Sequence, residues 1–204
     1  MVEWQLRRRG ISDERVLAAM AEVPRELFVG ESQRRRAYAD SALPIDAGQT
    51  ISQPWIVAAI CQALELTGSE RVLEVGTGSG YQAAVLAELA AEVHTIERIP
   101  ELAAQARENL EAAGYDRVLV HVGDGSLGLP EHAPFDAIAV AAAAPRLPQQ
   151  LYDQLEPRGR LAVPVGGRWG QRLELIVRSP EGPAVVRSVP CRFVPLVGRG
   201  GFEQ

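Results

Sequence analysis

Three glycines at alternate positions, Gly76, Gly78 and Gly80, separate an apolar run from a helix-like segment. Glycine lets the backbone approach a ligand closely and tolerates positive φ. Glu97 closes the next apolar run about 20 residues further on, the offset at which a carboxylate holds ribose hydroxyls in nucleotide-binding α/β proteins. The glycines alone could form a tight turn without a ligand, but together with Glu97 they predict a site for an adenine-nucleotide-like cofactor.

The charge beside the glycine turn indicates which cofactor fits. Glu74 lies two residues before Gly76, and the spacing is GxGxG rather than the GxGxxG of dinucleotide sites. A carboxylate there would repel a pyrophosphate and favour a cationic ligand. S-adenosylmethionine carries an ammonium and a sulfonium group, so it is preferred over NAD. A second acidic turn, Asp124 with Gly125, follows the third strand; alone it could be an ordinary turn.

The elements around these residues alternate between apolar strands and amphipathic helices, which predicts a parallel sheet with helices on both faces. A proline-ended helix is expected at 12–23. The last two strands, joined by a turn-rich connection, are expected to form an antiparallel edge. The predicted fold is a Rossmann-like, doubly wound, mostly parallel seven-stranded sheet with an N-terminal helical extension. Its strands are expected at 71–75, 92–97, 118–122, 135–140, 160–165, 172–178 and 184–194, and its further helices at 56–66, 80–90, 100–113 and 147–155.

Composition excludes several other classes of protein. The net charge is −5 over 204 residues, so the arginine runs 7–9 and 34–36 are interpreted as solvated surface and no nucleic-acid partner is expected. No run approaches the roughly 20 apolar residues of a membrane span, and acidic residues interrupt the N-terminal stretch where a signal peptide would be apolar. We therefore expect a cytoplasmic protein.

Metal chemistry has little support in the sequence. The histidines His94, His121 and His132 are scattered along the chain, and the cysteines Cys61 and Cys191 lack a CxxC spacing. Both cysteines are interpreted as buried small apolar residues. We expect no metal.

The segment 74–80 resembles the first motif of class I methyltransferases, in which a carboxylate after the third strand lies against the adenine amino group; that pattern assigns Asp124 and Gly125 to the cofactor. The end of the fourth strand, 136–145, is apolar and has neither Asn-Pro-Pro-Tyr nor Pro-Cys. Such a wall suits an acceptor that is already nucleophilic, as a carboxylate with a pKa near ~4 is at neutral pH.

The irregular stretch 30–53 is long for a compact protein, and such stretches are usually functional. Its segments 38–45 and 48–54 resemble the protein-L-isoaspartate O-methyltransferases, and similarity extends over about 6–198. The resemblance implies transfer of a methyl group from S-adenosylmethionine to L-isoaspartyl, and also D-aspartyl, carboxyls in damaged proteins, leaving S-adenosylhomocysteine. It further implies that Ser52 is the catalytic residue, that the backbone of Thr50 and Ile51 closes over the cofactor, and that Thr77 of the glycine turn binds the cofactor. Without the resemblance, Ser52 would be interpreted as a helix N-cap.

The expected organisation is an N-terminal extension with the active-site loop at 1–53 and one compact cofactor-binding core at 54–204, as a monomer. Two alternatives stay open. A nicotinamide-dependent oxidoreductase shares the strand, the glycine turn and the distant acid. A non-catalytic relative could bind S-adenosylmethionine as a structural or sensing ligand.

Overall fold

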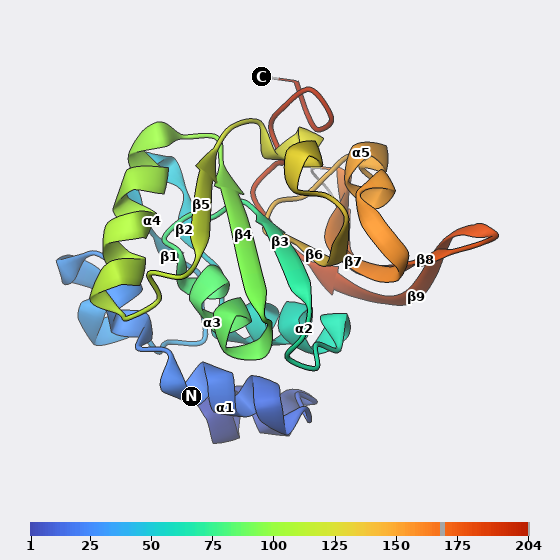
Figure 1. Cartoon of the computed structure of the whole chain (residues 1–204). Coiled ribbons are helices and arrows are strands. Elements are labelled where there is room, and N and C mark those ends of the chain that lie inside the picture. Colours follow the sequence, from blue (N-terminus) through green and yellow to red (C-terminus); the bar gives the residue numbers. More distant parts are fainter. Residues whose placement is uncertain (168–169, 204) are drawn as a thin grey trace.

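The computed structural model describes residues 1–167 and 170–203, and its centre is one seven-stranded sheet (Figure 1). The strand order is β5-β4-β3-β6-β7-β8-β9. The first five strands in this order pair in parallel, and β8 and β9 add antiparallel strands at one edge. The predicted fold class is therefore confirmed. The strands are β3 Arg71–Val75, β4 Glu92–Glu97, β5 Leu119–Val122, β6 Phe135–Val140, β7 Leu155–Gly167, β8 Gly170–Ser179 and β9 Gly182–Cys191.

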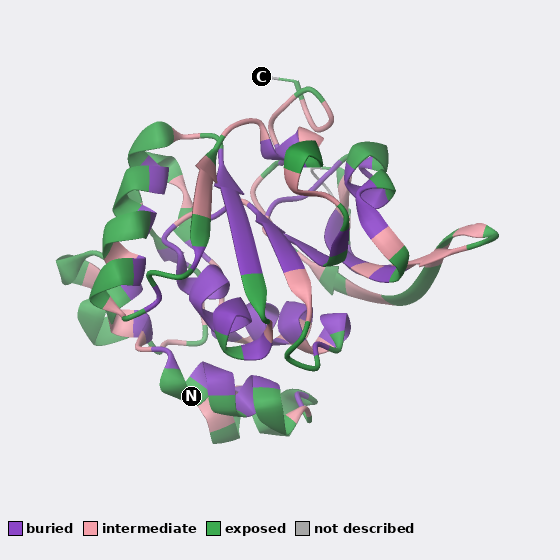
Figure 2. Ribbon diagram, in the orientation of Figure 1, coloured by how far each residue is buried: buried purple, intermediate pink, exposed green. Residues whose placement is uncertain are grey.

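Helices cover both faces of the sheet, but unequally. One apolar cluster joins one face of the sheet to four helices, and a second cluster joins the opposite face to the short helix α5. In the innermost helix, α3, only Glu88 is exposed, because both its sides pack against other elements (Figure 2). The helices are α1 Glu14–Glu22, α2 Pro54–Leu64, α3 Tyr81–Leu89, α4 Pro100–Ala112 and α5 Gln149–Asp153.

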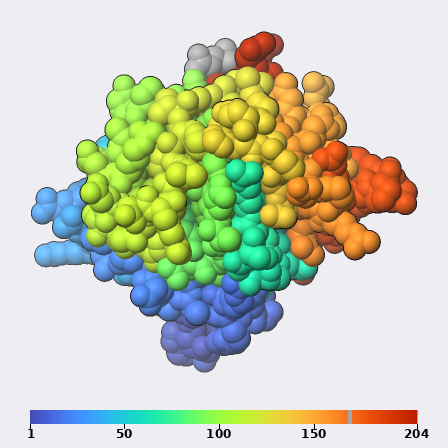
Figure 3. All heavy atoms as spheres, in the orientation of Figure 1, coloured from blue at the N-terminus to red at the C-terminus, as the bar shows by residue number. Residues whose placement is uncertain are grey.

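The N-terminal residues pack against the first cluster and form the lower end of the molecule in Figure 3. The Asp13 side chain caps α1 by accepting hydrogen bonds from the backbone N–H groups of Arg15 and Val16. The stretch 30–53 is more regular than expected, because β1 (Leu43–Pro44) pairs antiparallel with β2 (Thr50–Ile51). Short 3₁₀ helices, η3 (Arg25–Phe28), η4 (Glu31–Arg36) and η5 (Asp46–Gly48), complete this region.

Several element boundaries differ from the sequence prediction, and the largest differences are in β7 and β9. The register between β6 and β7 is interrupted between Phe135 and Ala137, which adds 155–159 to β7 and limits α5 to Gln149–Asp153. In the β8–β9 hairpin Ser179 pairs with Gly182, whose φ of 108° permits the tight turn, so β9 begins and ends earlier than expected. Residues 168–169 and 204, which belong to the predicted cofactor-binding core at 54–204, lie outside the described residues. No helix in the described part of the chain is long and apolar enough to cross a membrane.

Candidate active site

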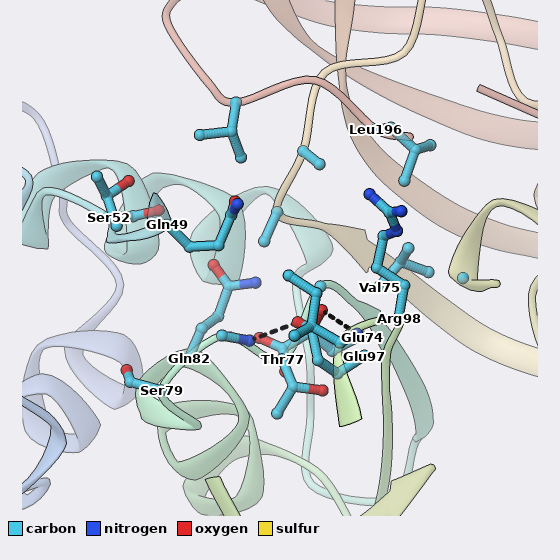
Figure 4. A pocket seen from close by; sticks show the side chains of 18 of the residues that line it. Gln49, Ser52, Glu74, Val75, Thr77, Ser79, Gln82, Glu97, Arg98 and Leu196 are labelled. Atoms are coloured by element: carbon cyan, nitrogen blue, oxygen red, sulfur yellow. Dashed lines mark hydrogen bonds between the residues drawn. The ribbon is translucent and has the colours of Figure 1, made fainter. Parts of the chain in front are cut away.

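A cavity of about 260 Å³ lies at the carboxyl ends of β3 and β4, where ligands bind in open parallel sheets (Figure 4). Figure 4 shows Ser52 and Gln49 on one side of it and Glu97 and Arg98 on the other. Most of the residues predicted for the site line this cavity; Gly80 and Asp124 do not. Those that do are Thr50, Ile51, Ser52, Glu74, Gly76, Thr77, Gly78, Glu97 and Gly125.

The three glycines of the turn have different tasks. All have positive φ: 94° at Gly76, 54° at Gly78 and 92° at Gly80. Gly76 and Gly78 border the cavity, where the lack of a side chain lets a ligand approach the backbone. A Cβ on Gly80 would lie 3.1 Å from Leu110 Cγ, so this glycine lets α3 pack closely against α4. Gly80 therefore serves the packing of the two helices and does not border the cavity.

Glu97 is fixed between the glycine turn and the start of α4. Its Oε2 accepts a hydrogen bond from the Gly78 N–H at 3.0 Å, and its Oε1 accepts one from the Ile99 N–H at 3.1 Å. A carboxylate offers about four acceptor sites, so two remain available toward the cavity. This arrangement suits a carboxylate that holds a pair of vicinal hydroxyls.

Glu74 is completely buried at the base of the cavity. Its Oε2 accepts a hydrogen bond from the Thr95 hydroxyl at 2.5 Å, and Thr95 in turn lies 2.6 Å from the Thr77 hydroxyl. Desolvation raises the pKa of Glu74 to about 8. The sequence predicts a fixed negative charge at Glu74, whereas a pKa of about 8 makes this side chain mostly a neutral acid at pH 7 in the unliganded protein. A cationic ligand would favour its ionised form.

Two buried polar atoms beside the cavity lack partners among the described residues. They are Oε1 of Glu74 and Nε2 of Gln82, and both residues line the cavity. An unsatisfied buried polar atom costs about 1–3 kcal/mol, which a bound ligand can remove. These atoms are therefore suited to bind polar groups of a ligand.

Asp124 is engaged elsewhere. Its Oδ1 accepts hydrogen bonds from the Ser126 N–H and hydroxyl at 3.0 and 2.6 Å, and its Oδ2 accepts one from the Arg199 N–H at 2.8 Å. These hydrogen bonds hold the pKa of Asp124 below its usual value. The C-terminal segment thus returns over Asp124, a long-range contact that local sequence could not reveal. Its neighbour Gly125 does line the cavity, and a Cβ there would lie 2.8 Å from Val75 Cγ1.

A second cavity of about 510 Å³ adjoins the first, and the two share Thr50, Ser52, Ala141 and Val194. Ser52 therefore lies where both spaces meet. The alternative interpretation of Ser52 as a helix cap is wrong, because the N-cap of α2 is Gln53 and no side-chain hydrogen bond caps this described helix.

Arg25 fixes the backbone at Ser52 from beneath. This arginine is completely buried; its Nε donates to the Ala37 carbonyl and its Nη2 to the Ser52 carbonyl, both at 2.7 Å. The guanidinium lies 4.6 Å from the centre of the Tyr81 ring, a cation–π contact. Burial lowers the pKa of Arg25, but an arginine stays protonated in proteins. Sequence reasoning gave Arg25 no such role.

Other lining residues were also missed by sequence reasoning. Gln82 lies in the first turn of α3 and Arg98 directly follows Glu97, so adjacency to a predicted site residue could have found both. Gln49 lies in the segment that carries the family resemblance. Leu196 comes from the far end of the chain, also within the similarity to the family, but the sequence gives no other sign that it lies at the cavity.

The three histidines are scattered along the sequence, but the folded chain brings them together, so the inference against a histidine cluster is wrong. His94, His121 and His132 each offer a ligand nitrogen, and these nitrogens lie within 4.8 Å of one another. In the parallel register Ile96 pairs with His121 and His94 with Leu119, which places both strand histidines on one face. None of the three lines the cofactor cavity.

Comparison with known proteins identifies the family. A family model described as protein-L-isoaspartate(D-aspartate) O-methyltransferase matches residues 1–201. The chain belongs to this family. A member from Syntrophobacter fumaroxidans, named protein-L-isoaspartate O-methyltransferase 1, is 56% identical over all of this chain and 95% of its own length. One from Methanoculleus marisnigri is 55% identical over all of this chain and 92% of its own length.

Solved structures agree with this family membership. A structure titled protein-L-isoaspartate O-methyltransferase has a TM-score of 0.87 at 30% identity, over 98% of this chain and 66% of that one. A Plasmodium falciparum protein described as a putative family member, in complex with S-adenosyl-L-homocysteine, has a TM-score of 0.78 at 28% identity, over 92% of this chain and 93% of that one. The resemblance found in the sequence is confirmed.

Proposed function

We propose that this protein transfers a methyl group from S-adenosylmethionine to the free carboxyl of L-isoaspartyl, and also D-aspartyl, residues in damaged proteins and peptides. S-adenosylhomocysteine is the second product. The observation that carries the proposal is the meeting of two adjoining cavities at Ser52: one has nucleotide-site features and the other opens beside it. Family membership supplies the substrate class.

The residues of the first cavity fit the cofactor. Glu97 has free acceptor sites for ribose hydroxyls, and Gly76 and Gly78 allow close approach to the backbone. The unpartnered Oε1 of Glu74 suits a cationic group, and Gly125 lines the cavity while packing so closely against Val75 that a Cβ there would lie 2.8 Å from Val75 Cγ1. S-adenosylmethionine supplies an electrophilic methyl group when bound. Gly80 and Asp124 act indirectly, through helix packing and the C-terminal segment.

The second cavity suits an acidic peptide. Its lining includes the basic residues Arg9 and Arg192 and the aromatic residues Trp55 and Phe193. A carboxylate is ionised at neutral pH, so the acceptor needs no general base, and positioning supplies most of the catalysis. The aromatic rings and Ala141 exclude water from the acceptor oxygen.

Ser52 orients the acceptor carboxylate through its hydroxyl. The Arg25 contact to the Ser52 carbonyl fixes the backbone, so that the hydroxyl has a defined position where the cavities meet. Arg25 is therefore a positioning residue. Thr50 and Ile51 form the neighbouring wall through the β1–β2 pairing.

We further propose that residues 1–53 form an extension that carries this acceptor wall and that 54–204 form the cofactor-binding core. The protein is a cytoplasmic monomer without a nucleic-acid partner. The proposals on partners rest on the net charge of −5 and on the basic and aromatic residues that line the second cavity.

The activity is tested by labelled methyl transfer to a synthetic peptide containing one L-isoaspartyl residue, with the normal aspartyl peptide as the control. We expect a base-labile methyl ester on the first peptide alone, and a D-aspartyl peptide tests the additional substrate. Calorimetry with S-adenosylmethionine and NAD separates the alternatives: binding of S-adenosylmethionine without transfer would support a non-catalytic relative, and binding of NAD an oxidoreductase.

Replacing Ser52 by alanine tests the catalytic assignment. Loss of one hydrogen bond to a charged group lowers kcat/KM for the isoaspartyl peptide by about 10- to 100-fold. S-adenosylmethionine affinity should stay within about twofold, since the hydroxyl is assigned to the acceptor. Ser32→Ala, at an exposed position in η4, is the matched control and should leave both quantities unchanged. Unchanged turnover in Ser52→Ala would contradict the assignment.

A further inference from the structure

One face of β4 and β5 lies under an unusual connection. The links from β3 to β4, from β4 to β5 and from β6 to β7 each contain an α-helix. Between β5 and β6 the described chain has only the 3₁₀ turns η6 (Gly125–Leu127) and η7 (Pro130–His132), the yellow segment of Figure 1. This thin cover leaves Leu119, the register partner of His94, 45% exposed.

The thin cover brings three imidazoles together. The His94 and His121 rings stack with centroids 5.2 Å apart, and the His132 ring lies 4.6 Å from His94 and 4.9 Å from His121. His94 Nδ1 lies 3.0 Å from His121 Nε2. Two strands and one turn, separated in sequence, thus direct nitrogen ligands toward one point.

The surroundings of His94 resemble the second shell of a metal ligand. The His94 side chain is buried, and its Nε2 lies 2.5 Å from a Glu92 carboxylate oxygen. The same oxygen accepts a hydrogen bond from Arg71 Nε at 3.1 Å, so it is itself fixed. Metal-ligating histidines commonly donate their other ring N–H to a carboxylate in this way, which fixes the tautomer. His94 Nδ1 then carries the free lone pair toward the other two histidines.

We propose that His94, His121 and His132 form a binding site for one divalent transition-metal ion of the zinc type, separate from the cofactor cavity. Three neutral imidazoles favour zinc or copper over the hard cations magnesium and calcium. His121 and His132 are half-buried, so the ion can enter from solvent and keep a water ligand. The site joins the β5–β6 connection to the sheet.

The nitrogens require only a small adjustment. In a tetrahedral zinc site with bonds of about 2.0–2.1 Å, the ligand nitrogens are roughly 3.4 Å apart. The pair at 3.0 Å must open slightly, and the most distant pair must close from at most 4.8 Å. Since His94 donates to Glu92, His121 donates Nε2–H to His94 in the metal-free protein. Metal binding moves that proton to His121 Nδ1 through solvent, with no net loss of protons.

Protonation of His94 and His121 competes little with the metal at neutral pH. Desolvation lowers the pKa of both His94 and His121, and their mutual proximity lowers that of His121 further. Arg71 and Arg107 also disfavour a charged imidazole, whereas Glu92 and Glu131 favour it. The imidazoles of His94 and His121 therefore stay available as ligands.

The chain contains only these three histidines, which makes the test direct in an untagged protein. After removal of metal by a chelator, isothermal titration with Zn²⁺ should show one site with a Kd in the micromolar range or below. Long-range ¹H–¹⁵N spectra of the imidazoles should show all three rings shifting and His121 changing tautomer. At a Zn²⁺ concentration one hundred times Kd, Tm should rise by about 5–10 °C, whereas Mg²⁺ should not change it.

The variants His121→Gln and His132→Gln separate a metal site from a simple imidazole stack. Both side chains are half-buried, so each variant should keep its far-ultraviolet circular dichroism while its Zn²⁺ affinity falls at least tenfold. Cys191→Ser, at the half-buried thiol, should bind Zn²⁺ as the wild type does. Binding weaker than about 0.1 mM, absence of the His121 tautomer change, or unchanged affinity in both histidine variants would overturn the proposal.

Discussion

The cofactor end and the acceptor end of the adjoining cavities each rest on one completely buried ionisable side chain, Glu74 and Arg25. Among the described residues neither forms a salt bridge. Glu74 accepts one short hydrogen bond and has one unpartnered oxygen, and burial raises its pKa. Arg25 donates to two carbonyl groups and lies against an aromatic ring.

The difference shows two uses of a buried ionisable group. Glu74 can lose its charge, so the cofactor end tolerates an unsatisfied atom that a cationic ligand can later contact. Arg25 cannot lose its charge, so the acceptor end surrounds it with two carbonyl acceptors and an aromatic ring, and the contact to the Ser52 carbonyl fixes the backbone there; among the described residues its Nη1 has no hydrogen-bond partner. Glu74 is thus suited to contact a ligand, whereas Arg25 stabilises the local backbone. Three substitutions test this contrast.

The largest effect is expected from Glu74→Gln on the pH dependence of stability. With a folded pKa of about 8 and an unfolded pKa near 4.5, the wild type binds more protons when folded between these values. The stabilisation is complete below pH 4.5 and is lost as the pH rises through 8, so the free energy of unfolding should fall by roughly 3 kcal/mol from pH 5 to pH 8. Glu74→Gln lacks this slope.

Urea unfolding of both proteins at several pH values measures the difference. Glu111→Gln, exposed on α4, is the control and should keep the wild-type slope. Parallel curves for wild type and Glu74→Gln would show that Glu74 is ionised in the folded protein at pH 7, and the proposed contrast with Arg25 would then be lost.

The next effect concerns the cofactor end alone. Glu97→Ala removes the acceptor for the Gly78 and Ile99 N–H groups and for the ribose, so S-adenosylmethionine affinity should fall about 100-fold. Calorimetry measures this, with Glu111→Ala as the matched control. Unaltered affinity would count against the ribose role and leave Glu97 as a structural cap of the turn.

The two ends also differ in how far the sequence could predict them. The cofactor end comes from 71–99, where the glycine turn, the strand register and the offset to Glu97 are all local features. The mostly parallel sheet and the presence of its helices followed from the same alternation, whereas the strand order was not predicted. Residue types and spacing therefore sufficed to place Gly76, Gly78 and Glu97 at one cavity.

The acceptor end and the histidine cluster depend on contacts between distant segments. Arg25 contacts Ser52 across a segment that contains the β1–β2 pair, and the Asp124 contact requires the C-terminal segment to return. The boundary of β9 depended on a tight turn at Gly182. The three histidines converge because parallel register places two of them on one face and η7 covers it. The spacing of residues along the chain does not predict contacts between distant segments. For Ser52, only the family resemblance indicated a place in the active site.

The smallest effect, and the most specific one, is expected from Arg25→Lys. Lysine keeps the positive charge but lacks the planar fork, so it cannot donate to the Ala37 and Ser52 carbonyls together. One buried acceptor left unpaired lowers the free energy of unfolding by about 2 kcal/mol. Because the freed segment carries Ser52, kcat/KM for the isoaspartyl peptide should fall about tenfold, while S-adenosylmethionine affinity stays within about threefold.

Arg160→Lys, in the exposed ion pair with Glu65, is the matched control and should change stability by less than about 1 kcal/mol. A loss of cofactor affinity equal to the loss of kcat/KM would mean that Arg25 supports both ends alike, which would remove the distinction between them.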